Sequence, residues 1–215
     1  MAKTLDALPP RAALAAAAGQ FYQRGWMFGT AGNLSARVDP YPHQKESSFW
    51  ITTSGVPKGT LDEGDFLEIS CQSGHLLREH PHHRPSAETS IHQVIYRLFP
   101  AATCCMHIHS INSALATQKL AAESNSLPLP PLEMIKGFQI WEENPEITLP
   151  VFENHLNVPL IAQEIERRFT LHTPIVPALM IRRHGITVWG SSIQETFNRV
   201  ELMEFILGYL AHSSP

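Results

Sequence analysis

Apolar residues recur at helical spacing in several stretches of the chain. Ile91, Val94, Ile95 and Leu98, for example, fall on one face of the segment that follows Pro85. Helix-start signals, which are a proline in the first turn or a small polar N-cap residue, precede these stretches. The predicted N-caps are Ser86, Ser110, Asn157 and Ser192. The predicted helices cover residues 11–24, 86–99, 110–121, 157–169 and 192–210.

Short β-rich or apolar runs bounded by turn residues predict strands between these helices. The predicted strands lie within residues 34–38, 47–55, 65–70, 101–109 and 147–153, with two more in 178–190 around a turn at His184-Gly185. The segment SLPLPPLEMIKG is too rich in proline for a central strand or a helix interior. Because helices and strands interleave and no long linker divides them, we predict one α/β sandwich over residues 1–215, with a loose segment at 1–10.

The composition of the 215 residues is that of a globular protein. Hydrophobic residues make up 43% and charged residues 17%, which excludes a disordered chain. The formal net charge is -4 and no basic patch stands out, so nucleic acid is not expected as the main partner.

The chain carries no sign of a membrane or secreted protein. No apolar run reaches the roughly 18 residues of a membrane span. The Ala-rich stretch after Pro10 is interpreted as a helix and not as a signal peptide. The three cysteines, two of them adjacent, make a poor disulfide framework. We therefore expect a protein of the reducing cytoplasm.

Histidine is unusually frequent, with 12 residues, and two of them flank Ile108 at the end of a predicted strand. Residues i and i+2 of a strand point to the same face, so His107 and His109 present their imidazoles side by side. They could be ordinary half-exposed strand residues, or two ligands of a metal site. Catalytic zinc commonly takes three protein ligands.

The third ligand could come from His184 or from a loop cluster. We favour His184 because two predicted strands fix its turn, whereas the loop is rich in proline and typical of a solvated surface. The loop histidines are His80, His82 and His83. Cys104, Cys105 and the helical His92 are interpreted as structural residues.

Three segments offer hydroxyls and backbone N–H groups that could bind an anion. GTAGN (residues 29–33) and TTSG (52–55) follow apolar segments, and Ser86 lies at a predicted helix N-terminus. Each signal is weak alone, and neither loop is a Walker loop or a dinucleotide fingerprint. Together, beside a possible zinc site, they predict a phosphorylated small substrate.

Two glutamates are candidates for acid/base chemistry. Glu88 lies in the first turn of a predicted helix, where stabilisation of the helix dipole is the alternative role. Glu133 has apolar neighbours in the segment PPLEMIKG. Burial there would raise its pKa and suit a general base, and the alternative is an exposed loop residue.

The segments GTAGNLSAR, ITTSG, RPSAE, MHIHS and RRHGITVWG occur in the order seen in the class II aldolase/adducin family. The chain resembles this family from about residue 11 to 210. The resemblance implies a three-layer α/β/α sandwich with a mostly antiparallel central sheet, commonly a homotetramer with active sites near subunit interfaces. It implies one zinc ion per subunit on His107, His109 and His184. It assigns the substrate phosphate to Asn33, Thr53, Ser54, Gly55 and Ser86.

The resemblance also separates the two glutamates. In the family's aldolases, a Glu that matches Glu88 is an acid/base near the metal, and a Tyr lies where Glu133 falls. LEMIKG, followed by LPVFEN, is similar to the family's dehydratases, in which a Glu matching Glu133 is the acid/base. We therefore expect a lyase of methionine salvage that dehydrates 5-methylthioribulose 1-phosphate, with Glu133 and Glu88 catalytic.

Two alternatives remain open. One is a sugar-phosphate aldolase or epimerase that acts on fuculose or ribulose phosphate through the same zinc. The other is a non-catalytic, adducin-like scaffold, which predicts lost ligands, although this chain has all three histidines. For the dehydratase, the candidate apolar wall around the methylthio group is formed by Phe28, Met134 and Trp141.

Overall fold

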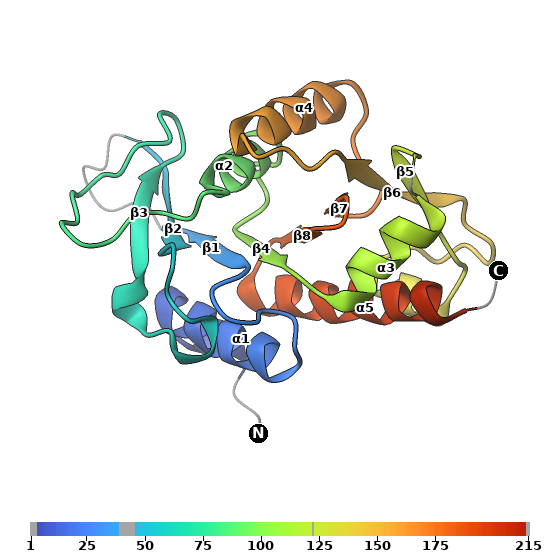
Figure 1. Ribbon diagram of the computed structural model, residues 1–215, viewed down its shortest axis with the longest axis horizontal. Coiled ribbons are helices and arrows are strands. Elements are labelled where there is room, and N and C mark those ends of the chain that lie inside the picture. The colour runs from blue at the N-terminus through green and yellow to red at the C-terminus, as the bar shows by residue number, and fades with distance from the viewer. Residues whose placement is uncertain (1–3, 39–45, 122, 214–215) are drawn as a thin grey trace.

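The computed structural model describes residues 4–38, 46–121 and 123–213, which form eight strands and five α-helices (Figure 1). The strands are β1 (Asn33–Arg37), β2 (Ser48–Thr52), β3 (Phe66–Ser70), β4 (Cys104–Ile108), β5 (Ser126–Leu129), β6 (Ile147–Phe152), β7 (Ala178–Ile181) and β8 (Gly185–Gly190). The α-helices are α1 (Pro10–Gln23), α2 (Thr89–Leu98), α3 (Ile111–Leu120), α4 (Val158–Leu171) and α5 (Ile193–His212). The short 3-10 helices are η1 (Leu5–Ala7), η2 (Lys58–Thr60), η3 (Glu63–Asp65) and η4 (Glu133–Phe138).

The strands form one sheet in the order β3-β2-β1-β4-β8-β7-β6-β5. β6 and β7 are parallel, whereas the other neighbouring pairs are antiparallel, which confirms the predicted sheet type. β4 lies between β1 and β8, and its residue His107 pairs with Asn33 and Thr187. The C-terminal end of β4 and the N-terminal ends of β1 and β8 therefore lie side by side, at the same end of these three central strands.

Alternate side chains of β4 face opposite sides of the sheet. Met106 and Ile108 belong to the core that contains the buried residues of α1 and α5. Cys105 belongs to the second core, with the buried residues of α2 and α4. His107 points to the same side as Cys105, so its imidazole faces the α2 layer.

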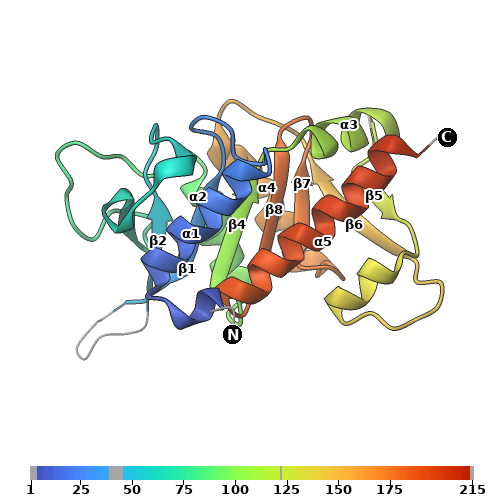
Figure 2. The same cartoon turned by 90° about the horizontal axis from the view of Figure 1, so that it is seen from below.

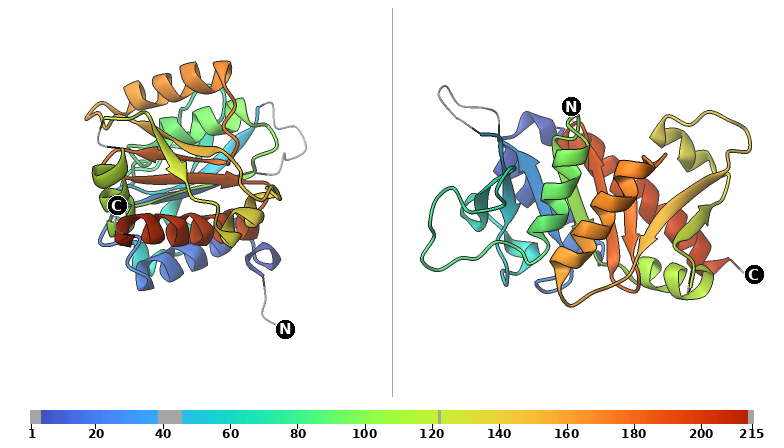
Figure 3. Two further views of the ribbon diagram at one scale, coloured as in Figure 1. Left: turned by 90° about the vertical axis from the view of Figure 1, so that its right-hand side faces the viewer. Right: turned by 90° about the horizontal axis from the view of Figure 1, so that it is seen from above.

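Helices cover both faces of the sheet. Figures 1 and 3 show α1 and α5 on one face and α2 and α4 on the other. In Figure 2, α1 and α5 lie across the strands, and α3 continues from β4 beside α5. The fold is the three-layer α/β/α sandwich that the family resemblance implied.

The proline-rich segment that was excluded as a central strand contributes β5 at the edge of the sheet. There it pairs with β6, and Pro128 lies opposite Thr148. Proline lacks an N–H donor, and an edge strand has one side on which no donor is needed. The edge strand was not predicted, but the exclusion of a central one is confirmed.

The beginning of α2 differs from the prediction. The helix starts at Thr89 with Glu88 as its N-cap, so the predicted cap at Ser86 is wrong. Ser86 lies in the turn before the helix, where its Oγ accepts a hydrogen bond from the Glu88 amide (3.3 Å). The turn places Glu88 against the sheet before the helix begins.

Residues 1–3 of the predicted loose N-terminal segment lie outside the described residues. Within the rest of that segment, Leu5 is buried against the core, and its amide donates to Gln194 Oε1 (2.9 Å). None of the described helices is both long enough and apolar enough to cross a lipid bilayer.

Candidate metal centre and phosphate loops

His107 and His109 lie where β4 leads into α3. His107 is 1% exposed, and its Nδ1 lies 2.9 Å from Thr187 Oγ1 on β8. The Nε2 atoms of the two histidines are 2.9 Å apart. Ile108 between them is fully buried in the opposite core. Strand alternation therefore places both imidazoles together, as predicted.

His184 reaches this pair from the turn between β7 and β8. Arg183 adopts a left-handed conformation there, with φ 51°. A Cβ on Gly185 would lie 2.1 Å from the Ile108 carbonyl oxygen, so glycine is what lets β8 begin this close to β4. His184 Nδ1 lies 3.2 Å from Asn154 Oδ1. Because that oxygen can only accept, His184 Nδ1 donates to it in this contact.

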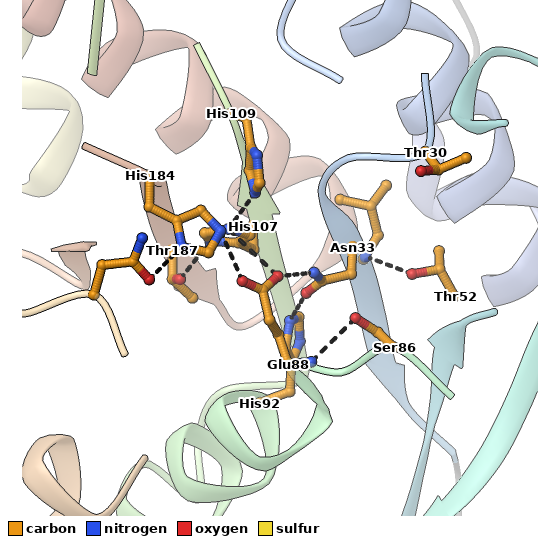
Figure 4. Close-up of polar contacts among 12 residues, drawn as sticks. Thr30, Asn33, Thr52, Ser86, Glu88, His92, His107, His109, His184 and Thr187 are labelled. Carbon is orange, nitrogen blue, oxygen red and sulfur yellow. Dashed lines mark hydrogen bonds and ion pairs between the residues drawn. The ribbon is translucent and has the colours of Figure 1, made fainter. Parts of the chain in front are cut away.

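The three imidazoles converge with one carboxylate. Their ring centroids are 4.8, 5.1 and 4.4 Å apart. Glu88 Oε1 lies 2.9 Å from His184 Nε2, and Glu88 Oε2 lies 3.5 Å from His107 Nε2. One ligand atom from each of the four residues lies within 4.8 Å of the others. Figure 4 shows the four side chains pointing toward a common centre.

The protonation states of this cluster suit a cation. Burial lowers the pKa of His107 to about 4 and that of His109 to about 3, so both imidazoles are neutral at neutral pH. Burial alone would raise the pKa of Glu88, but His107 and His184 hold it below its usual range. Neutral imidazoles and an ionised carboxylate are ligands that zinc takes in proteins. The four residues could therefore hold a divalent metal ion.

The competing histidines lie elsewhere. His80 and His82 are exposed in the loop before α2. The His80 ring stacks on His83, with centroids 4.3 Å apart. The structure thus brings His184, and none of the three loop histidines, to the pair at the end of β4.

The fold and the cluster can be compared with known proteins. The family model for the Class II Aldolase and Adducin N-terminal domain matches residues 12–210. This chain belongs to that family. Curated relatives agree with the assignment, and a solved structure shares the fold.

A methylthioribulose-1-phosphate dehydratase of Microcystis aeruginosa is 53% identical over 201 residues, which cover 94% of each chain. One from Leptospira biflexa is 46% identical over 194 residues, or 89% of this chain and 91% of that protein. The crystal structure of l-fuculose-1-phosphate aldolase from Thermus thermophilus has a TM-score of 0.66 at 24% identity, covering 93% and 94% of the two chains. It shares the class II aldolase fold.

The loops that were predicted to bind the substrate phosphate lie beside the histidine cluster. The amide of Ser54 donates to Arg84 O (2.8 Å) and that of Ser86 to Thr52 O (3.2 Å), so two of the loops are tied together. The amide and hydroxyl of Thr53 both donate to Asp65 O. Within the described residues, the exposed Ser54 hydroxyl and Gly55 amide have no partner. These two groups are open to an anion.

Two contacts of these loops were not predicted. Lys58 is 1% exposed, and its Nζ donates to Thr30 O (3.0 Å) and Val56 O (2.9 Å), which joins the loop before β1 to the loop after β2. The side chain of Asn33 donates to Glu88. The sequence gives no sign that this lysine is buried. It lies in the polar turn SGVPKG, and its partners are backbone carbonyls, which no side-chain pattern reveals.

Glu133 does not join the cluster within its own chain. Its side chain is 80% exposed and lies 2.9 Å from Lys136 Nζ, so the burial expected of a base is not met in the single chain. It begins η4, which Figure 2 shows in yellow, at the end of the sheet away from the junction of β4 and α3. Met134 and Trp141 lie near it in sequence, whereas the exposed Phe28 precedes the loop at residues 29–33.

Proposed function

We propose that this protein is a zinc-dependent dehydratase that converts 5-methylthioribulose 1-phosphate into 2,3-diketo-5-methylthiopentyl 1-phosphate, in the cytoplasmic pathway of methionine salvage. One observation carries the proposal: three histidines converge with Glu88 in a chain that is 53% identical to a methylthioribulose-1-phosphate dehydratase over 94% of both lengths. The open Ser54 hydroxyl and Gly55 amide near the cluster support a small phosphorylated substrate.

Zinc is the proposed ion because the donor set of the cluster suits it. Ligation by His107, His109 and His184 would leave a coordination position open to substrate, which is typical of catalytic zinc. When bound, the ion supplies Lewis-acid polarisation of the oxygens beside the reacting carbons. Thr187 and Asn154 orient two of the imidazoles through Nδ1, which keeps Nε2 directed at the centre.

The reaction requires a base that reaches C3 and an acid that meets the hydroxyl leaving C4. The C3 proton is acidic because the C2 carbonyl is adjacent. Loss of hydroxide from C4 leaves an enol at C3 and C4, which becomes the second ketone when C4 gains a proton. A single carboxylate between C3 and C4 can take the first proton and return it to the departing hydroxyl, so that water leaves.

We assign that carboxylate to Glu133, contributed by a neighbouring subunit of a homotetramer. Its exposed side chain, remote from the cluster of its own chain, is free to reach across an interface. Glu88 is proposed as the second catalytic carboxylate, because its oxygens lie 2.9 Å and 3.5 Å from imidazole nitrogens of the cluster, where they can accept a proton from a substrate hydroxyl.

The loops are proposed to hold the phosphate so that C3 meets the base. The open Ser54 hydroxyl and Gly55 amide would donate to the phosphate oxygens, with Ser86 beside them. Asn33 and Thr53 would fix the shape of the loops around the anion. A fixed phosphate removes much of the entropic barrier to placing the reacting carbons.

The substrate assignment is tested by incubating the zinc-loaded protein separately with 5-methylthioribulose 1-phosphate, fuculose 1-phosphate and ribulose 5-phosphate. We expect the first to lose one water, read by mass spectrometry, and the other two to stay intact. Cleavage or epimerisation of the other two, with the first unchanged, would establish an aldolase or epimerase instead. A protein with neither turnover nor bound zinc would support the adducin-like scaffold.

The assignment of Glu133 across an interface is tested by mixing two inactive variants, Glu133→Gln and His184→Ala, under conditions that exchange subunits. A site becomes complete where a Glu133→Gln subunit supplies its intact histidine cluster and a neighbouring His184→Ala subunit supplies its intact Glu133. Random mixing is expected to restore roughly a quarter of the sites. Exchanged oligomers without recovered turnover would contradict the assignment.

A further inference from the structure

A buried row of polar side chains connects Glu88 to the interior between β1 and α2. The row contains Asn33 and Ser35 from β1 and His92 and Tyr96 from α2, and each of them is at most 2% exposed. His92 follows Glu88 by four residues and Tyr96 follows His92 by four, so their side chains lie on one side of α2. Figure 4 shows Asn33 between Glu88 and His92.

The contacts form a sequence of short hydrogen bonds with one longer side contact at Ser35. Tyr96 Oη lies 2.7 Å from Ser35 Oγ, which lies 2.6 Å from His92 Nδ1. The other ring nitrogen, His92 Nε2, lies 2.5 Å from Asn33 Oδ1. Asn33 Nδ2 then donates to Glu88 Oε2. A carbonyl oxygen, that of Cys105, also lies 3.3 Å from Ser35 Oγ, but this contact is much longer.

The chemistry of the partners gives this row one direction. The NH2 group of Asn33 faces Glu88 and its amide oxygen faces His92, which is the orientation that a carboxylate acceptor requires. That oxygen also only accepts, so His92 Nε2 carries the proton and Nδ1 the lone pair. The Ser35 hydroxyl then donates to Nδ1, and the Tyr96 hydroxyl donates to Ser35. Every proton of the row points toward Glu88.

A reversed row also satisfies every group. It requires a protonated Glu88, a flipped Asn33 amide and a proton on His92 Nδ1 instead of Nε2. The geometry opposes it. Both oxygens of Glu88 lie close to imidazole nitrogens of the cluster, and the Asn33 amide presents Nδ2 to Glu88 and Oδ1 to His92. A doubly protonated His92 would fit the same contacts, but burial lowers the pKa of His92 to about 4, so the ring is neutral and carries a single proton.

We propose that His92 is a positioning residue of the metal centre: held as the Nε2–H tautomer, it orients the Asn33 amide, which holds the Glu88 carboxylate against the histidines. The effect on turnover rests on the proposed function, whereas the tautomer and the amide orientation do not. A misoriented amide would turn its oxygen toward the carboxylate and leave a buried ion without its donor, which is costly in a region of low dielectric constant.

The tautomer can be read directly by nitrogen-15 NMR of the histidine-labelled, zinc-loaded protein, with the His92 signals assigned from a His92→Gln variant. We expect a proton on Nε2 and an unprotonated Nδ1. A proton on Nδ1, or on both nitrogens, would overturn the proposal. This measurement needs no substrate, so it remains decisive even if the proposed function fails.

The positioning role is tested with two matched variants. In His92→Gln, the side-chain NH2 can occupy the place of Nε2 and still donate to Asn33, whereas in His92→Asn the amide is too short to reach it. With zinc content and helical circular dichroism equal in both, the Gln variant is expected to stay within a few fold of wild-type kcat. The Asn variant is expected to lose about tenfold or more. Equal kcat in the two variants, at any level, would overturn the positioning role.

Discussion

Gly185 is the position where the sheet and the candidate metal centre constrain each other most directly. A Cβ added there would lie 2.1 Å from the Ile108 carbonyl oxygen and 3.1 Å from ring carbons of both His107 and His109. The carbonyl cannot rotate away, because β4 is paired with β1 and β8 on its two sides. In Gly185→Ala, the end of β4 must therefore separate from β8 by about 1 Å to restore ordinary contact, a strain that typically costs about 1–3 kcal/mol.

The same displacement moves His184 away from the other two histidines, since it directly precedes Gly185. A shift of about 1 Å in a catalytic site can lower the rate by roughly a hundredfold. We expect Gly185→Ala to bind zinc more weakly in a chelator competition and to lose most of its kcat, while remaining folded by circular dichroism. Gly19→Ala is the control: nothing lies within 4 Å of that Cβ, so it should keep zinc and gain about 0.5–1 kcal/mol as a helical residue. Wild-type zinc affinity in Gly185→Ala would refute this reasoning.

Four further predictions concern single groups. His184→Ala should lose zinc by elemental analysis, and an unchanged zinc content would point to the loop histidines instead. Glu133→Gln should keep zinc but lose turnover, and full activity would exclude this residue as the base. Lys58→Met leaves two buried backbone carbonyls without their donor, so the KM for the phosphorylated substrate should rise about tenfold. An unchanged KM would show that the link between the two loops through Lys58 does not shape the phosphate site. Burial lowers the pKa of His92 and His107 to about 4. Below about pH 6.5, the unfolded metal-free chain therefore binds more protons than the folded one. The free energy of unfolding of the metal-free protein should fall as the pH drops from about 6.5 to 4. An unfolding free energy that stays constant over this range would contradict the prediction.

The layers of the fold were predictable because the apolar pattern of each element is local. The stripe from Ile91 to Leu98 required only helical spacing, and it lies in the core as expected. The start of α2 was not predictable in the same way. Ser86 has the chemistry of an N-cap, but its amide donates to Thr52, a contact between segments distant in sequence. A propensity rule cannot anticipate such a contact.

The candidate site was predictable to the extent that it depends on strand geometry. Alternation along β4 placed His107 and His109 together, and the turn before β8 indicated His184. Lys58 and Thr187 were missed because their roles depend on which loops and strands become neighbours. The expectation for Glu133 came from its apolar sequence neighbours, which pack against the core while its own side chain faces solvent.

The polar row behind Glu88 shows which signal was present in the sequence but not used. On α2, the apolar residues from Ile91 to Leu98 account for one face, and His92 was interpreted as structural. Glu88, His92 and Tyr96 are nevertheless spaced by four, which makes a second stripe beside the first. Both stripes are buried. A helix buried over so wide an angle must satisfy the polar stripe internally. Its partners had to be polar residues of the facing strand, and the alternating Asn33 and Ser35 of β1 are such a pair.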